Sequence, residues 1–166
     1  MRHILSVTVN NQPSVLARIS GLFSRRNFNI LSLNVGETEL PEYSRMTIVV
    51  EGNTDTLEQV KKQLYKLIDV IKITELNQSN MIERDMAIIK VNCGKNQRSQ
   101  VIQVVDVFRG KVVDFSLDTI TVEITGDENK INAFIEIMKD FGIKEVVRTG
   151  IVAIDREMNN NALTNS

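Results

Sequence analysis

The stretch HILSVTVNNQPSVLARISGLF, residues 3–23, passes from a strand-like pattern into a helical one. Apolar and polar side chains alternate over residues 3–9, which is typical of a β-strand with one buried face. Asn-Gln-Pro at 11–13 breaks this alternation. We expect a helix to begin at Pro13, because proline lacks a backbone N–H and this loss costs nothing in the first helical turn, where N–H groups have no intrahelical partner. Helical spacing indicates that its buried face contains Val15, Leu16, Ile19, Leu22 and Phe23.

Two strands, a helix and a further strand are predicted to complete the first half of the chain. Strands are expected over 28–35 and 45–50, separated by a Gly/Glu/Pro loop. Asp55 and Glu58 have the spacing of a capping box and predict the start of a second helix. The apolar stripe expected on that helix consists of Leu57, Val60, Leu64, Leu67 and Ile68, and a strand over 70–76 follows.

The same order of elements recurs after residues 77–84, a polar stretch that we interpret as a linker. Such βαββαβ units form a ferredoxin-like layer of helices on an antiparallel sheet. We therefore predict an α+β chain with two ferredoxin-like domains in tandem, 1–78 and 79–156, and a disordered tail over 157–166. In the second half, strands are expected over 86–93, 111–116, 119–125 and 143–154, and helices over about 97–108 and from Asp127.

The sheet face that the helices leave open in the first half is also expected to be apolar. Each half has only about 75 residues, which makes a marginal core on its own. An apolar second face indicates packing against another sheet or another chain, so the pattern predicts self-association. The residues assigned to this face are Ile4, Leu31, Leu33 and Val49.

The composition excludes several classes of protein. Of 166 residues, 19 are Ile and 19 are Val, while the net charge is −1 and gives no general attraction to nucleic acid or acidic membranes. A single cysteine, Cys93, cannot form an internal disulfide or a Cys-based zinc site. His3 is the only histidine, and we expect it to be an exposed strand residue. With no signal-peptide pattern and no membrane-length apolar run, these features predict a cytoplasmic chain without a metal site. The scarcity of His and Cys narrows the possible catalytic chemistry but leaves carboxylate, lysine and Ser/Lys chemistry open.

Two asparagine-containing segments remain as candidate binding sites. The first N–H groups of a helix point outward with the positive end of its dipole and suit a carboxylate, so the loop at Asn11 could receive an amino acid. An asparagine before a helix is more often a cap or turn residue, and from spacing alone that interpretation is favoured. Asn27 fits a left-handed helix cap, whereas Asn29 should already lie in the next strand.

Longer stretches of the chain resemble a known family. The first half is similar to an ACT domain, the module that binds amino acids where two such domains pair. Both halves together resemble the small, regulatory subunit of acetolactate synthase (acetohydroxyacid synthase) over about residues 3–156. The stretches that carry the resemblance are 11–33, 44–50, 63–70, 83–91, 108–114 and 141–150.

The resemblance implies a chain that is not itself an enzyme. Family members bind a large catalytic subunit that carries thiamine diphosphate, Mg and FAD, so no cofactor is expected on this chain. The small subunit activates that partner in branched-chain amino-acid biosynthesis and confers feedback inhibition, usually by valine. The ACT domains form a homodimer, and one chain offers its strand–helix loop while the other offers the start of strand two. The matching effector-binding residues are Asn11, Pro13, Ser14, Val15, Leu16, Asn29 and Ile30.

One position departs from the family pattern. The family loop usually has glycine where this chain has Ser14, whose hydroxyl either adds a hydrogen bond or crowds the pocket. Two other classes remain open: a free-standing ACT-type sensor, and an enzyme on a ferredoxin-like fold, for which no clustered acid, base or nucleophile is found. A nucleic-acid-binding sheet of the same order would carry aromatic residues on its central strands, and 45–50 has none.

Overall fold

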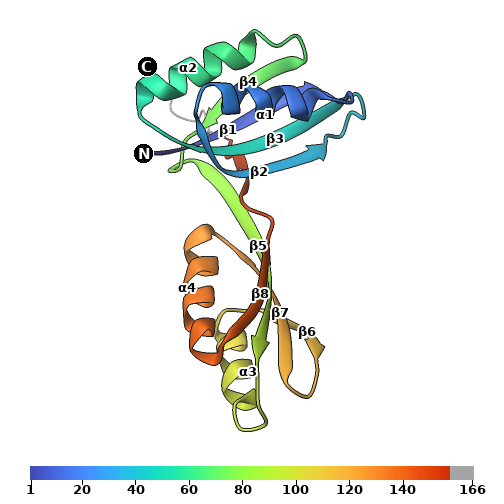
Figure 1. The fold of residues 1–166 in the computed structure, drawn as a ribbon, viewed down its shortest axis with the longest axis vertical. Coiled ribbons are helices and arrows are strands. Elements are labelled where there is room, and N and C mark those ends of the chain that lie inside the picture. Colours follow the sequence, from blue (N-terminus) through green and yellow to red (C-terminus); the bar gives the residue numbers. More distant parts are fainter. Residues whose placement is uncertain (158–166) are drawn as a thin grey trace, which may run out of the picture. The chain divides into compact units, whose positions relative to one another are not determined.

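The computed structural model describes residues 1–157 and divides the chain into two compact units (Figure 1). The first unit contains Met1–Ile82 and the segment from Ala153 onward. The second unit contains Glu83–Val152. Each unit has two helices on one face of an antiparallel sheet, as the βαββαβ pattern predicts.

In the first unit, the strand order β2-β3-β1-β4 leaves β2 and β4 at the sheet edges. Apolar side chains from alternate positions of the strands meet the buried faces of both helices, and Leu5, Ile48 and Phe23 lie at the centre of this core. The elements are β1 (Arg2–Asn10), α1 (Val15–Arg25), β2 (Asn29–Glu37), β3 (Tyr43–Glu51), α2 (Thr54–Tyr65) and β4 (Val70–Leu76).

The second unit repeats this topology with the order β6-β7-β5-β8. Its core is equally apolar, with Ile89, Ile124 and Phe134 fully buried. A ninth strand, β9, pairs with β5. The elements that follow β4 are β5 (Met81–Asn92), α3 (Arg98–Val107), β6 (Lys111–Phe115), β7 (Thr119–Gly126), α4 (Glu128–Met138), the 3-10 helix η1 (Lys139–Phe141), β8 (Ile143–Arg148) and β9 (Val152–Asp155). The first two residues of β5 and the last three of β9 belong to the first unit.

Two side chains that were assigned to buried helix faces are exposed. Leu16 is 44% exposed, because Val15, Ile19, Leu22 and Phe23 already fill the buried side of α1. Ile68 is 93% exposed, since α2 ends at Tyr65.

The predicted capping box is also absent. The side chain of Asn53 accepts a hydrogen bond from the amide N–H of Thr56, so Asn53 is the N-cap of α2 and Asp55 lies inside the first turn. By contrast, Asp127 caps α4 by accepting from the amide N–H of Lys130, as expected for a helix start at that position.

Several strand predictions also need correction. Residues 81–84 belong to β5 rather than to a linker, and Met81 is buried. The predicted strand 143–154 is two strands, because the chain turns at Gly150, where φ is +77°. Leu33 packs against the helix-side core, whereas Ile4 and Val49 lie on the other face and are buried. The predicted tail, 157–166, lies outside the described residues beyond position 157.

Candidate functional site

The turn between β1 and α1 has an unusual backbone conformation. Ser14 is the N-cap of α1 and has φ +73° and ψ −7°, in the left-handed region that favours glycine. Its hydroxyl forms no capping hydrogen bond. The prediction that the helix begins at Pro13 is therefore wrong, since the chain reverses at Ser14 and the helix begins at Val15.

Hydrogen bonds hold this loop against its neighbours. The backbone N–H of Asn11 donates to the carbonyl oxygen of Glu42 at 2.8 Å, and the Asn11 side chain donates to that of Pro41 at 3.0 Å. The Asn11 side-chain oxygen accepts no hydrogen bond from the described residues. The Asn11 side chain thus ties this loop to the one at Pro41 rather than capping α1, and among the described residues its oxygen remains an acceptor that suits an ammonium group.

A charged contact fixes the start of α1. The Arg18 guanidinium donates to the Asp69 carboxylate at 2.6 Å, and the Asn10 side chain donates to the other carboxylate oxygen at 3.4 Å. These partners are more than 50 residues apart in sequence, and no local spacing pattern points to them. The contact holds the loop and the first turn of α1 to the start of β4.

The first turn of α1 presents unpaired amide groups. The earliest intrahelical bond runs from the N–H of Arg18 to the carbonyl oxygen of Ser14, so the N–H groups of Leu16 and Ala17 precede it. A hollow of about 440 Å³ continues from this turn along the exposed side of the helix. Its lining residues are Ser14, Ala17, Arg18, Gly21, Ser24 and Arg25.

The other two candidate residues lie at the opposite end of the sheet. Asn29 pairs with Glu51 on β3, whereas Asn10, just before the loop, pairs with Tyr43. The nine residues of β3 separate these ends by roughly 27 Å. The structure therefore brings Asn11, Pro13, Ser14, Val15 and Leu16 together but leaves Asn29 and Ile30 of the same chain far away. Asn27 is the left-handed residue expected between α1 and β2, with φ +57°.

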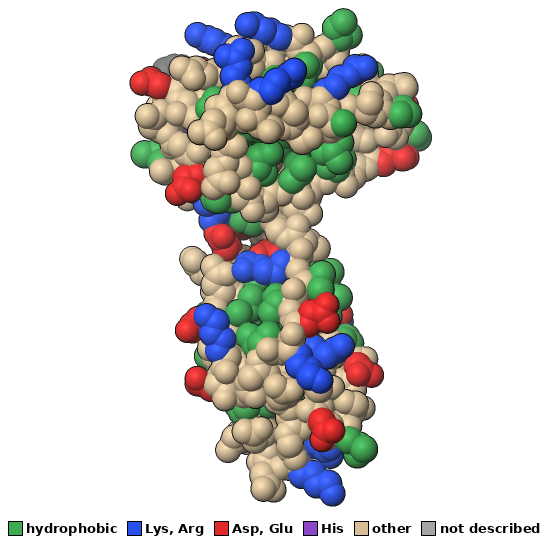
Figure 2. Space-filling view, in the orientation of Figure 1, with side chains coloured by type: hydrophobic (Ala, Val, Ile, Leu, Met, Phe, Trp, Pro, Cys, Tyr) green, Lys and Arg blue, Asp and Glu red, His purple; other side chains and the backbone are tan. Residues whose placement is uncertain are grey.

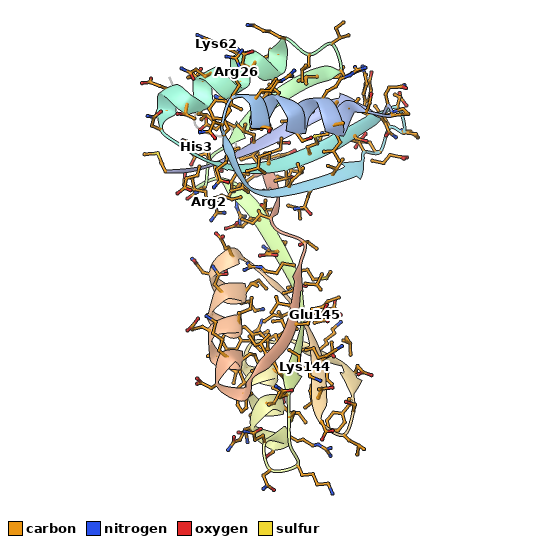
Figure 3. The ribbon with its side chains drawn as sticks, viewed as in Figure 1. Arg2, His3, Arg26, Lys62, Lys144 and Glu145 are labelled. Carbon is orange, nitrogen blue, oxygen red and sulfur yellow. The ribbon has the colours of Figure 1, made fainter. Side chains whose placement is uncertain are left out.

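His3 belongs to a polar cluster elsewhere in the first unit (Figure 3). The prediction that it is exposed is wrong: its side chain is 10% exposed and contacts the Glu75 carboxylate and the Gly52 carbonyl oxygen. The hydrogen bond to Glu75 raises the pKa of Lys61, against a lowering by burial. Burial alone would raise the pKa of Glu75, but hydrogen bonds and charge interactions with Lys61 and His3 outweigh this and hold the pKa below its ordinary value.

Cys93 and the basic side chains on the helices of the first unit both have structural explanations. Burial raises the pKa of the Cys93 thiol, and the nearby Arg98 opposes the shift, so the thiol is a small buried group as expected. Lys and Arg side chains gather over the helices of the first unit (Figure 2), and Arg26 and Lys62 lie near the ends of α1 and α2 (Figure 3). Cations at helix C-termini are stabilised by the helix dipole.

Within residues 1–157, no group of three His, Cys, Asp or Glu side chains is placed to hold a metal ion. In the same part of the chain, no helix is both long and apolar enough to cross a membrane.

Comparison with known proteins shows the family of this chain. The family model described as the small subunit of acetolactate synthase matches residues 84–157, and that of the AHAS small subunit-like ACT domain matches residues 5–72. The chain belongs to the family of acetolactate synthase small subunits. The first unit is thus an ACT domain, as the sequence predicts.

Individual relatives cover almost the whole chain. The probable acetolactate synthase small subunit of Archaeoglobus fulgidus is 49% identical over 156 residues, covering 94% of this chain and 98% of the relative. The acetolactate synthase small subunit of Mycobacterium leprae is 51% identical over 154 residues, covering 93% and 91%. The crystal structure of the small subunit from Thermotoga maritima superposes with a TM-score of 0.89 at 42% identity, covering 95% and 99%. The fold of this chain, over both units, is therefore that of an acetolactate synthase small subunit.

Proposed function

We propose that this chain is the non-catalytic regulatory subunit of a cytoplasmic acetolactate synthase. It activates a large catalytic subunit, which carries thiamine diphosphate, Mg and FAD, and it confers feedback inhibition by a branched-chain amino acid, with valine as the expected effector. Family membership supports the partner. The separation of the two halves of the candidate site supports binding of the effector between two copies of the chain.

The edge strand β2 offers the surface for pairing two ACT domains. Among the strands within residues 1–157, β2 pairs with β3 alone, and it exposes Leu31 and Val35 at 49% and 46%. An unpaired strand edge is a template for pairing with another chain. The outer side of α1 also allows a second ACT domain to approach closely, because its residues Ala17, Gly21 and Ser24 are small.

Antiparallel pairing of β2 with its copy would complete the site. In one chain, Asn29 begins β2 at the far end of the sheet and Glu37 ends it at the loop end, opposite Ser44. A two-fold axis through the middle of β2 places Asn29 of one copy opposite Glu37 of the other. Asn29 and Ile30 would then face the partner's loop. This opposite-end placement is the observation that carries the proposal.

The paired site has the chemistry that an aliphatic amino acid requires. The N–H groups of Leu16 and Ala17 would receive its carboxylate at the positive end of α1. The free side-chain oxygen of Asn11 would accept from its ammonium group, and Ile30 would contact its side chain. Ligand bound across two chains stabilises one arrangement of the ACT pair, and inhibition follows if the catalytic subunit prefers another.

Reconstitution with a large subunit tests the activating and inhibitory roles separately. We expect the chain to raise the rate of acetolactate formation and valine to lower it. Asn11→Ala and Asn29→Ala should each weaken inhibition at least about fivefold while activation remains. Asn96→Ala, an exposed loop change in the second unit, is the matched control and should alter neither.

Each possible failure points to a different error. No rate increase and no co-purification would exclude the activating role and favour a free-standing sensor. Activation without a response to valine, leucine or isoleucine would remove the feedback role alone. Simultaneous loss of activation and inhibition in Asn11→Ala would mean that the loop is structural.

A further inference from the structure

The sheet of the second unit ends on an edge strand, β6, that exposes apolar side chains (Figure 1). Among the strands within residues 1–157, β6 pairs with β7 alone, and all five of its residues are exposed. Val113 and Phe115 are 53% and 50% exposed. A strand edge of this kind is a template for pairing with another strand. The order of the side chains on β6 decides which kind of strand fits it.

A bulge in β6 changes which of its side chains share a face. Residues three apart on a regular strand point to opposite faces of the sheet. Lys111 and Asp114 are three apart, but their partners on β7, Glu123 and Thr121, are only two apart, because Val113 has no partner there. Lys111 and Asp114 therefore project from the same face of the sheet.

The two charged side chains of β6 have no partner within the described part of the chain. The Lys111 ammonium group and the Asp114 carboxylate form neither a hydrogen bond nor an ion pair within residues 1–157. A lysine and a bulge often protect an edge strand from association. Here the two charges have opposite signs and share a face, so the edge attracts a strand that carries the same charges in reverse order.

A second copy of β6 presents this reverse order when it pairs antiparallel with the first. A two-fold axis between Val112 and Val113 places Lys111 of each copy opposite Asp114 of the other. Directly opposed charges of opposite sign stabilise a pair of strands, whereas like charges destabilise it. The edge is thus complementary in charge to itself.

The same register also matches the side chains on the helix side of the sheet, where it places Gly110 opposite Phe115. A Cβ atom at Gly110 would contact Val105 of the buried core, and Phe115 pairs with Ile120 of that core, so both positions face the helices. The Arg98 guanidinium lies over the Phe115 ring, 5.0 Å from its centroid. The ring of each copy can pack over the other copy's glycine, which has no side chain to obstruct it.

We propose that the second units of two copies of this chain pair through β6, antiparallel and about a two-fold axis. The pairing forms two contacts between Lys111 and Asp114 and covers the apolar side chains of the edge. It is separate from the proposed pairing of ACT domains through β2, and it requires no effector. It gives the second unit a role in assembling the small subunits.

Disulfide cross-linking of the full-length chain tests the pairing and its register. Lys111→Cys and Asp114→Cys chains, co-expressed with different tags, should form at least tenfold more covalent dimer than either chain alone. In a pair of identical variants the two new thiols lie two cross-strand positions apart, beyond the reach of a disulfide. The native Cys93 is buried and does not compete. Lys144→Cys with Val147→Cys, which has the same spacing on the opposite edge strand β8, is the matched control and should not cross-link.

Hydrogen exchange of the backbone amides of residues 111–115 tests the charge pairing. Protection should rise with protein concentration in the wild-type chain. Asp114→Lys opposes two lysines in each pair and should speed exchange at least fivefold, and Lys111→Asp/Asp114→Lys should restore the protection.

Two results would overturn the proposal. One is equal cross-linking in the mixed and single samples, and the other is unchanged exchange in Asp114→Lys. Protection that appears only when the large subunit is added would also overturn it, and would assign this edge to that partner instead. Valine takes no part in these measurements, so their failure leaves the proposed feedback site untouched.

Discussion

Replacing Ser14 with glycine should stabilise the first unit. A non-glycine residue in the left-handed region costs about 1–2 kcal/mol, and Ser14 has φ +73°. Glycine relieves that cost, but it also raises the conformational entropy of the unfolded chain, which destabilises the fold by about 0.4–1 kcal/mol. The Ser14 hydroxyl makes no capping hydrogen bond, so no cap is lost. The net expectation is a gain of about 0.5–1 kcal/mol in the free energy of unfolding.

Tyrosine fluorescence during urea unfolding measures this change in the first unit alone. Both tyrosines of the chain, Tyr43 and Tyr65, lie in that unit, and the chain has no tryptophan. Ser20→Gly is the matched control, because Ser20 is an exposed residue inside α1 where glycine costs about 0.5 kcal/mol.

A urea midpoint of Ser14→Gly that is equal to or below that of the wild-type chain would refute the strain argument.

The same variant also decides how Ser14 affects effector binding. Stronger valine inhibition means that the side chain crowds the site, and weaker inhibition means that its hydroxyl contacts the ligand.

Three further changes test contacts elsewhere. Asp127→Ala removes the N-cap of α4 and should lower the thermal stability of the second unit by about 1 kcal/mol, measured by circular dichroism. Asp85→Ala removes the buried carboxylate that accepts from Arg148, whose side chain is 31% exposed, and we expect a loss of about 1.5–3 kcal/mol in the same measurement, whereas a neutral result would mean that water replaces the contact. The pKa of Glu75 is lowered in the folded state, so its contribution is present above the ordinary value of 4.5 and is lost as pH falls through the folded value. The difference in unfolding free energy between wild type and Glu75→Gln should therefore shrink between about pH 7 and about pH 3, and a constant difference would exclude the charge contribution.

The order of elements could be predicted because each strand and helix shows its periodicity locally. Alternation in β1 and the spacing of Val15, Ile19, Leu22 and Phe23 depend only on neighbouring residues. Errors arose where a boundary depends on backbone conformation or on distant partners. The helix begins two residues later than predicted because Ser14 adopts a left-handed conformation. Residues 81–84 lie in β5, a strand that also pairs with the distant β9.

The candidate site was predictable in its parts but not in its arrangement. Asn11 stands out as a residue before a helix, yet its bonds to Pro41 and Glu42 cross between loops about 30 residues apart. The burial of His3 depends on Glu75, which is 72 residues away.

The distance between Asn11 and Asn29 within one chain has a genetic consequence under the proposed pairing. A dimer then holds two composite pockets, each built from the loop of one subunit and the strand of the other. When an Asn11→Ala chain meets an Asn29→Ala chain, both defects fall in one pocket and the other pocket is wholly wild type. Two alleles that are each insensitive to feedback should therefore restore partial sensitivity when they are expressed together.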